Sequence, residues 1–253
     1  MVTTIMKNLL ETYNNDGYFI QTNFFDQEFI ESLLKDIEIA KNKKDADIYL
    51  DRNGLPRRIE RLYDKSENLK LLNFKISEFL EKVFKKSFLI FKDKFNSKPP
   101  GGEGYQAHYD GVFKFIDKDN VKKNGWYEYS NYFVNVLVSL DKSDDNNGTL
   151  QISNVHKKNF EELLSKTLRD GSPNLDPKFE KSLKFESINL NVGDILIFDN
   201  RCPHRSNKNK SNNMRRILYY TYSLSSAGSQ YKKYFSDKES SKNVSSKSLI
   251  GDA

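Results

Sequence analysis

Two of the three histidines stand where they could hold a metal ion. His108 opens the triplet His108-Tyr109-Asp110 beside the glycine-rich turn PPGGEGYQAHYDG, and residues two apart in a strand or its extension point the same way. His204 follows the apolar run DILIFDN and could supply a third ligand from across a barrel. Two imidazoles and one carboxylate leave three octahedral positions open, which is typical of iron(II) that binds a keto acid and dioxygen.

Zinc is the weaker alternative, because it prefers a closed tetrahedral site or three ligands plus water. His-x-Asp by itself also occurs by chance, and the bland interpretation is a surface histidine beside an acid. Two residues that follow His204 in the sequence, Ser206 and Arg215, favour a metal site over a surface histidine. Ser206 offers a hydroxyl, and Arg215, at the start of an apolar strand, offers the bidentate cation that the far end of a dicarboxylate needs.

Two amphipathic helices are expected to support this site. The segment DQEFIESLLKDIEIA, with Asp26 as its N-cap, spaces its apolar residues for one helix face: Ile30, Leu33, Leu34 and Ile37. The segment KISEFLEKVFKK does the same with Ile76, Phe79, Leu80 and Val83. We therefore expect both helices to buttress a sheet.

After Lys86 the pattern changes to short runs rich in aromatic and β-branched residues, which is typical of strands. The runs are SFLIFKDKFNSK, NYFVNVLVSLD, GTLQIS, FESINLNVGDILIFDN and RRILYYTYSL. Two turns lie between them, VGD at 192–194 and DDNNG at 144–148, whose Asn-Gly pair suits a tight hairpin. Strands at this spacing predict a barrel or sandwich, so the fold should be mainly β with flanking helices.

The chain is long enough for one large core, and we expect a single catalytic domain over residues 1–253. Residues 1–86 would form a helical buttress and 87–224 the barrel core, with a helical insertion at 155–186. The Ser- and Lys-rich tail, 225–253, is expected to be poorly packed, at least past Ser240.

Composition excludes several classes of protein. The net charge is +6, but most lysines are interleaved with acids, which favours a solvated face over a nucleic-acid surface and also suits an anionic small substrate. No apolar run approaches the roughly 20 residues of a membrane span, and the opening residues lack the pattern of an export signal. The single Cys202 excludes an internal disulfide, so a cytoplasmic location is expected.

Four segments together resemble the phytanoyl-CoA dioxygenase (PhyH-like) family of iron(II)/2-oxoglutarate oxygenases, over about Asp16 to Ser223. DGYFIQTNFFDQEFIESLL resembles the opening strand and helix, and FKDKFNSKPPGGEGYQAHYD the strand, lysine, glycine-rich turn and His-x-Asp. DNNGTLQISNVHK resembles E-N-G-x-L-x-x-x-P-G-S-H-K, although Ser153 and Asn154 replace the usual Pro-Gly before His156, which is not a ligand in the family. VGDILIFDNRCPHRSNKNKSNNMRR resembles the closing G-D…H-x-S…R.

The resemblance implies a double-stranded β-helix, a jelly-roll of the cupin-like type. It implies that His108, Asp110 and His204 hold iron(II), with 2-oxoglutarate as cosubstrate and dioxygen as oxidant. Hydroxylation with release of succinate and CO2 is the expected reaction. Asp110 argues against a halogenase, which would need Ala or Gly at that position.

The resemblance also implies residues for the cosubstrate. Ser206 and Arg215 would bind the distal carboxylate of 2-oxoglutarate. Arg216 competes with Arg215, because neighbours along a strand face opposite ways, and the spacing from His204 favours Arg215. Three further residues would reach or line the cosubstrate: Asn96, Lys98 and Thr149.

The substrate is expected to be a small polar molecule, anionic or zwitterionic, because arginines and tyrosines lie near the expected entrance. The candidates are Arg57, Arg58, Tyr109, Trp126, Tyr127 and Arg201. Some PhyH-like bacterial enzymes hydroxylate organophosphonates such as 2-aminoethylphosphonate, and the sequence is compatible with that group. An amino acid, a betaine, an acyl-CoA ester or a natural product are the alternatives.

Three other functions are weighed against this one. Nucleic-acid dealkylases carry R-x-N-x-T-x-R at the last strand, whereas RRILYYTYSL lacks it. A barrel that only binds ligands would lack an iron ligand or the cosubstrate arginine, and both are present here. A zinc hydrolase would need a dedicated general base and would have no use for Ser206 with Arg215.

Overall fold

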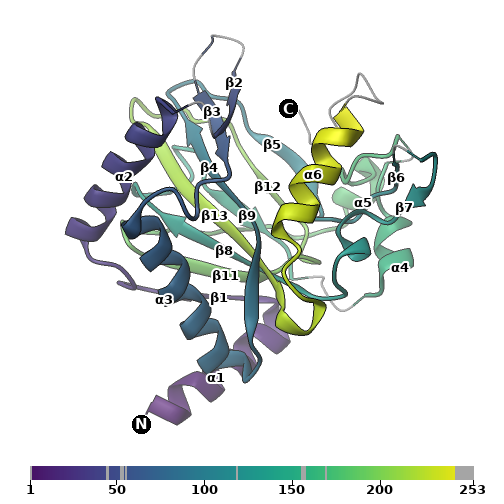
Figure 1. Cartoon of the computed structure of the whole chain (residues 1–253), viewed down its shortest axis with the longest axis horizontal. Helices are drawn as coiled ribbons and strands as arrows, with labels where there is room; N and C mark the ends of the chain where they lie inside the picture. Colours follow the sequence, from purple (N-terminus) through teal and green to yellow (C-terminus); the bar gives the residue numbers. More distant parts are fainter. Residues whose placement is uncertain are drawn as a thin grey trace.

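The computed structural model describes residues 2–242 except 44–45, 52–53, 55, 118, 155–157 and 169. Two antiparallel sheets face each other as a jelly-roll (Figure 1), which confirms the predicted fold class. The larger sheet runs in the order β1 (Tyr18–Gln21), β11 (Ile195–Asp199), β8 (Phe133–Ser139), β13 (Arg215–Leu224), β4 (Phe88–Lys98), β3 (Pro56–Glu60) and β2 (Asp47–Leu50). The smaller runs β10 (Glu186–Ser187), β9 (Leu150–Ile152), β12 (His204–Ser206) and β5 (Tyr105–His108). A separate pair joins β6 (Phe115–Ile116) to β7 (Lys122–Lys123).

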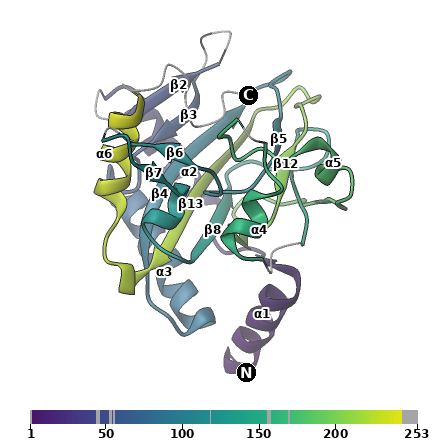
Figure 2. The ribbon, with the colours of Figure 1, turned by 90° about the vertical axis from the view of Figure 1, so that its right-hand side faces the viewer.

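Three helices pack on the outer face of the larger sheet: α1 (Val2–Asp16), α2 (Gln27–Lys41) and α3 (Glu67–Phe84), as Figures 1 and 2 show. The two predicted helices are α2 and α3. The Asp26 carboxylate caps α2 by accepting a hydrogen bond from the backbone N–H of Phe29 at 2.8 Å, and the Ser66 hydroxyl caps α3. The predicted apolar stripes face the sheet, whereas α1 was not predicted.

Residues 1–86 hold strands as well as helices. β1 pairs with β11, and β3 pairs with β4, so this part of the chain completes both ends of the larger sheet. The expected helical buttress thus also contributes strands, and β1 lies in the segment that the resemblance implied to be the opening strand. In the segment 155–186, two short helices were found, α4 (Phe160–Leu164) and α5 (Pro177–Glu180). His156 lies outside the described residues.

The turn at 144–148 does not close a hairpin. Its flanking strands, β8 and β9, belong to different sheets, so the chain crosses from one layer of the barrel to the other at this point. Gly148 has a φ of +73°, the conformation that the Asn-Gly pair predicted. Local sequence predicted the turn correctly, but not which strands pair, because the partner of each strand lies far away in the sequence.

Alternation along the strands separates the core from the interior of the barrel. On β13, Leu218 and Tyr220 pack in the core beneath the helices, whereas Ile217 and Tyr219 face the space between the sheets. Residues on β4 alternate in the same way, and Phe95 packs in that core. Three even-numbered residues of β4, Lys92, Lys94 and Asn96, line the interior pocket, and all three are polar.

The chain after β13 is better packed than the sequence predicted. A short 3-10 turn (Ser225–Ala227) leads into α6 (Tyr231–Lys242), which packs beside β4 (Figure 1). Tyr231, Tyr234 and Phe235 are buried in the main core, and the Tyr231 hydroxyl donates a hydrogen bond to the Asp93 carboxylate at 2.7 Å. The expectation of a poorly packed tail is wrong for these residues, because the aromatic side chains outweigh the polar residues between them.

Replacing Phe235 by alanine should lower the free energy of unfolding by about 3 kcal/mol, because a buried aromatic ring leaves a cavity when it is removed. Lys232, exposed on the same helix, is the matched control, and its alanine variant should change stability by less than about 0.5 kcal/mol. Urea denaturation measures both. Equal stability of the two variants would show that α6 does not pack on the barrel.

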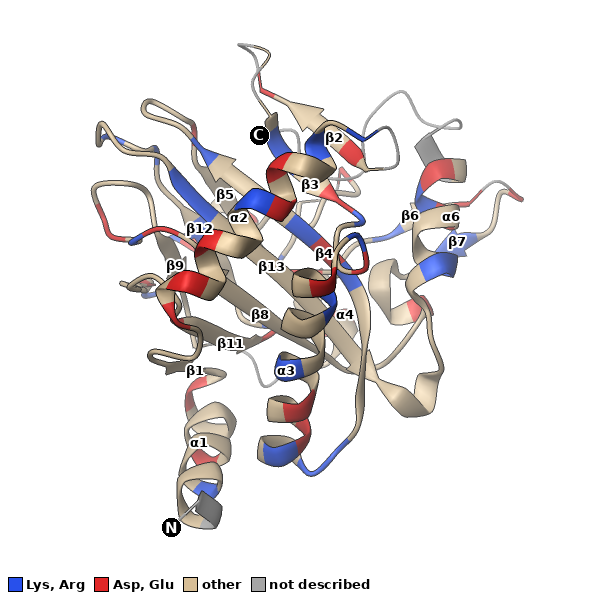
Figure 3. Cartoon of the chain, turned by 60° about the vertical axis from the view of Figure 1, so that its left-hand side comes forward, with Lys and Arg blue, Asp and Glu red and all other residues tan. Residues whose placement is uncertain are grey.

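Charges of both signs alternate along the exposed sides of α2 and α3 (Figure 3), as the interleaved sequence predicted. Within the described residues, no helix combines the length and apolar character needed to cross a bilayer. The notable basic residues lie elsewhere, on β3, β4 and β13, where they face the interior of the barrel.

Candidate metal centre

The three expected ligands lie together at one end of the smaller sheet. Ligand atoms of His108, Asp110 and His204 are all within 4.8 Å of one another. His108 is the last residue of β5 and lies opposite His204 on β12, with their ring centroids 4.3 Å apart, while Asp110 follows directly after β5. His204 therefore comes from the adjacent strand of the same sheet, and the expectation that it reaches from across the barrel is wrong.

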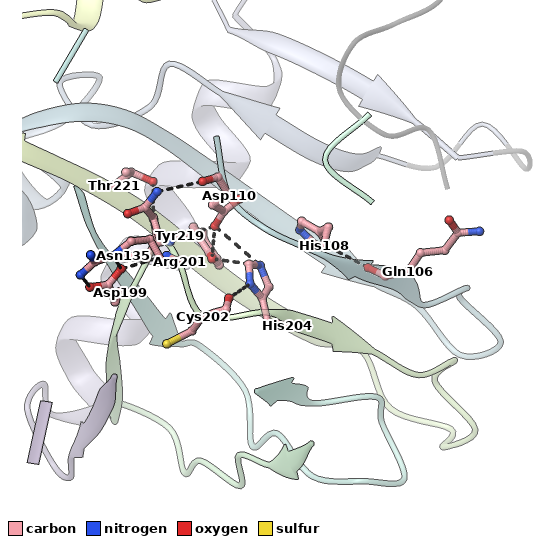
Figure 4. Close-up of polar contacts among 11 residues, drawn as sticks. Gln106, His108, Asp110, Asn135, Asp199, Arg201, Cys202, His204, Tyr219 and Thr221 are labelled. Atoms are coloured by element: carbon pink, nitrogen blue, oxygen red, sulfur yellow. Dashed lines mark hydrogen bonds and ion pairs between the residues drawn. The ribbon is translucent and has the colours of Figure 1, made fainter. Parts of the chain in front are cut away.

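Both imidazoles are held in the orientation that a metal needs. His108 Nδ1 lies 2.7 Å from the carbonyl oxygen of Gln106, and His204 Nδ1 lies 3.1 Å from that of Cys202 (Figure 4). A carbonyl oxygen can only accept, so each Nδ1 carries the proton and each Nε2 keeps its lone pair. Such contacts fix both the tautomer and the ring plane of a metal-binding histidine.

A chain of hydrogen bonds orients the carboxylate. Tyr219 donates its hydroxyl to Asp110 Oδ2 at 2.7 Å, and Asn135 donates its amide N–H to the same oxygen at 2.9 Å (Figure 4). Thr221 in turn donates to the amide oxygen of Asn135 at 2.8 Å. These residues lie on β8 and β13 of the opposite sheet, so the carboxylate is held by one layer of the barrel and the imidazoles by the other.

The backbone around Asp110 depends on a glycine. Gly111 has a φ of +78°, and a Cβ added there would lie 2.5 Å from the side chain of Trp126. Asn200 completes the support by donating its amide N–H to the carbonyl oxygen of Asp110 at 2.9 Å. The HYDG sequence thus ends β5 and turns the carboxylate toward the histidines.

Electrostatics keep the triad in its metal-binding protonation state. Burial, with the neighbouring His204, lowers the pKa of His108 to about 3, and burial also lowers the pKa of His204. Burial alone would raise the pKa of Asp110, but His204 and the Lys94 ammonium outweigh it and hold that pKa well below its usual range. Neutral imidazoles and an ionised carboxylate are the forms that bind iron(II).

A pocket opens beside the triad, and Arg215 faces into it from β13. Arg215 is 4% exposed, and its Nε has no hydrogen-bond partner. Burial lowers the pKa of Arg215 to about 10, so it stays charged at neutral pH. Arg216 points the other way and forms an ion pair with Asp141 at 2.7 Å. The structure thus separates the two competing arginines.

The other residues expected at the cosubstrate divide into two groups. Ser206 and Asn96 line the pocket, and the amide oxygen of Asn96 has no hydrogen-bond partner. Lys98 and Thr149 do not line it. The Lys98 ammonium donates to Ser206 Oγ at 2.9 Å and to two backbone carbonyls, and the Thr149 hydroxyl donates to the carbonyl of Ile188. Lys98 thus positions Ser206.

The substrate candidates divide in the same way. Arg58, Tyr109 and Trp126 line the pocket, whereas three others lie outside it: Arg57, Tyr127 and Arg201. The hydroxyl of Tyr109 is buried without a hydrogen-bond partner. Arg57 stacks on the Tyr105 ring, Tyr127 accepts from Asn200, and Arg201 pairs with Asp199.

Sequence reasoning missed several residues of the pocket, among them Lys92, Lys94, Tyr219 and Tyr234. The sequence FKDKFNSK did contain a signal for the lysines. Lys92, Lys94, Asn96 and Lys98 occupy alternate positions of an expected strand and should therefore share one face. No comparable signal existed for Tyr219, one of three tyrosines on β13 that could equally face the core. Tyr234 was missed because its helix was not predicted.

Comparison with known proteins identifies the architecture. The model of the phytanoyl-CoA dioxygenase (PhyH) family matches residues 13–217, which include the triad and Arg215. The chain belongs to this family. It is thus an iron- and 2-oxoglutarate-dependent oxygenase, with His108, Asp110 and His204 in the facial triad of such enzymes.

Two relatives act on phosphonates. The PhyH chain is 25% identical over 251 residues to a methylphosphonate hydroxylase from Gimesia maris, covering 95% of this chain and 89% of the relative. It is 28% identical over 184 residues to a 2-aminoethylphosphonate dioxygenase from an uncultured bacterium, covering 72% and 64%. Among solved structures, EctD from S. alaskensis with 2-oxoglutarate and 5-hydroxyectoine has a TM-score of 0.67 at 15% identity, covering 87% and 76%, which shows the same fold.

Replacing Tyr219 by phenylalanine should weaken iron(II) binding by about 10- to 100-fold, because Asp110 loses one of the two donors that orient it. Tyr220 is the matched control: it is the next residue on β13, and its buried hydroxyl has no hydrogen-bond partner. Its phenylalanine variant should bind iron like the wild type. Anaerobic titration with iron(II) measures both, and equal affinities would remove Tyr219 from the metal centre.

Proposed function

We propose that this PhyH enzyme hydroxylates a small organophosphonate, with release of succinate and CO2. The observation that carries the proposal is the charge of the pocket beside the triad. Its lining includes Arg58, Lys92, Lys94 and Arg215, while its one carboxylate is the iron ligand Asp110. Such a lining favours an anion over a zwitterion or a neutral ligand. The phosphonate relatives support the choice of anion.

The cosubstrate end of the pocket is assigned to Arg215, Ser206 and Asn96. The unpartnered guanidinium N–H of Arg215 suits the distal carboxylate of 2-oxoglutarate. Ser206 Oγ lies 2.9 Å from Lys98 Nζ and accepts a hydrogen bond from the backbone N–H of Tyr105 at 3.2 Å, and these contacts hold the hydroxyl where it would reach that carboxylate. These contacts orient the keto acid toward the triad.

Iron(II) with 2-oxoglutarate and dioxygen supplies the oxidising power, and the residues of the chain supply position and exclusion of water. Trp126, Tyr219 and Tyr234 give the pocket aromatic walls, and Tyr109 closes it with a fully buried ring. An oxidising centre screened from water in this way is protected from side reactions. The fixed cations would hold the substrate with its reactive carbon near the iron.

The test is a substrate screen with the iron-loaded protein, 2-oxoglutarate and dioxygen. Succinate release would be measured with alkylphosphonates, aminophosphonates, amino acids, betaines and acyl-CoA esters, and products followed by phosphorus NMR. We expect release with at least one phosphonate, with a hydroxylated phosphonate as the product. The proposal would be refuted if an amino acid, betaine or acyl thioester were turned over and no phosphonate caused succinate release.

A further inference from the structure

Two lysines of β4 face the same pocket at alternate positions. Lys92 is 5% exposed, and its Nζ lies 5.0 Å from the ring centroid of Trp126 and 5.4 Å from that of Tyr234. The Nζ of Lys94 lies 4.3 Å from the ring centroid of Tyr219, beside the iron ligand Asp110. Both ammonium groups thus lie among aromatic rings close to the metal centre.

Neither lysine has an anionic partner in the described part of the chain. Two of the other lining cations do: Arg205 pairs with Glu180 at 2.7 Å, and Arg58 lies 3.5 Å from Glu60, which also contacts Lys238. Burying an ammonium without an adjacent carboxylate costs free energy, which the aromatic faces offset in part. For Lys92, the more distant charges of Glu60 and Asp110 offset this cost further. An anion that enters the pocket would therefore be strongly attracted to these two groups.

Iron and the cosubstrate would not neutralise the charges of Lys92 and Lys94. Histidines that bind a metal are neutral, so iron(II) and Asp110 would leave one positive charge and Arg215 would add a second, which together balance the two carboxylates of 2-oxoglutarate. Lys92 and Lys94 then remain as two unbalanced positive charges. A phosphonate headgroup, which like a phosphate monoester carries up to two negative charges, matches them.

We infer that Lys92 and Lys94 form the headgroup subsite for a doubly charged phosphonate, and that the pocket prefers phosphonates without an amino group. The inference rests on the proposed function and names the residues that decide its specificity. It reverses the expectation of 2-aminoethylphosphonate as the example substrate.

The preference follows from what the lining lacks. An ammonium group on the substrate needs a carboxylate, and among the described residues that line the pocket the one carboxylate is that of Asp110, which is committed to iron. The faces of Trp126 and Tyr234 could otherwise receive a cation, but the Lys92 ammonium already lies over both. An amine would add a third positive charge beside two lysines, whereas an alkyl group carries no charge and can pack on the aromatic rings of the lining.

The test uses anaerobic protein loaded with iron(II) and 2-oxoglutarate, and follows the change in its visible absorption on titration with methylphosphonate and with 2-aminoethylphosphonate. Wild type should bind methylphosphonate at least about 10-fold more tightly. Lys92→Met and Lys94→Met should each weaken that binding by roughly 100-fold, the range for losing one member of a buried charge pair. Each variant is first saturated with iron(II) and 2-oxoglutarate, and the absorption band recorded before phosphonate is added shows that its metal centre is loaded. For Lys92→Met this band should match that of wild type.

Lys82→Met is the matched control, because Lys82 is exposed on α3, and it should bind methylphosphonate like wild type. Wild-type affinity in both β4 variants would overturn the subsite, and tighter binding of 2-aminoethylphosphonate would overturn the preference; in either case phosphonate hydroxylation itself would stand. If no phosphonate binds to wild type or is turned over by it, the proposed function fails, and the subsite fails with it.

Discussion

His108→Ala should abolish the visible absorption band that the anaerobic protein develops with iron(II) and 2-oxoglutarate. The substitution leaves only Asp110 and His204 to hold the ion, and it removes an imidazole whose lone pair is fixed toward the metal. Loss of an outer partner of a ligand already costs about 10- to 100-fold in metal affinity, so loss of the ligand itself should exceed that range. Catalytic turnover should fall below detection with it.

Gln106→Ala is the matched control for this experiment. Gln106 orients His108 through its backbone carbonyl, which the variant keeps (Figure 4). Its exposed side chain belongs to the pocket lining but provides no ligand atom to the triad. The band should therefore form as in wild type. A band that survives His108→Ala at wild-type intensity would contradict the triad, whatever the substrate of the enzyme.

Arg215→Ala should raise the concentration of 2-oxoglutarate needed for half-maximal formation of the band by roughly 100-fold. Truncating one partner of a buried, hydrogen-bonded charge pair costs about 2–5 kcal/mol, and Arg215 is a buried guanidinium with an unpartnered N–H in the pocket. Iron affinity without the cosubstrate should be nearly unchanged, because Arg215 is not a ligand. This difference between the two titrations separates loss of the cosubstrate from loss of the metal.

Arg216→Ala provides the comparison on the same strand. Its guanidinium is partly exposed and paired with Asp141 outside the pocket, so its loss should cost no more than about 1 kcal/mol of stability and leave 2-oxoglutarate binding intact. If the Arg216 variant lost the cosubstrate while the Arg215 variant kept it, our assignment of the two arginines would be reversed.

The metal centre could be predicted from the sequence because rare residue types carry it. The chain has three histidines, so few sets of metal ligands were possible. His108 precedes Asp110 by two residues, and His204 precedes Ser206 by two. The amphipathic helices were equally accessible, since their apolar spacing and the Asp26 cap are local properties. Arg215 could be chosen over Arg216 only by resemblance, and the opposite orientation of the two side chains came from the structure.

The tail and the turn at 144–148 show where local reasoning fails. The spacing of Tyr231, Tyr234 and Phe235 suits one helix face, but the polar residues between them made the segment look like a loop. The surface on which this face packs is known only from the structure. In the same way, the Asn-Gly pair determined the conformation of its turn and not the strands it joins. Both depend on partners that are distant in the sequence.

The residues that can bind iron, the strands that follow two amphipathic helices and the need for an arginine near the last strand could all be inferred from the sequence. The lining of the pocket became known from the packing of the two sheets. Of the three lysines at even-numbered positions of β4, the resemblance pointed to Lys98 for the cosubstrate, yet Lys98 donates to Ser206 and two carbonyls, whereas Lys92 and Lys94 line the pocket. The reason is physical: a strand determines which side a residue faces, but the strands and helices packed against it determine what lies there.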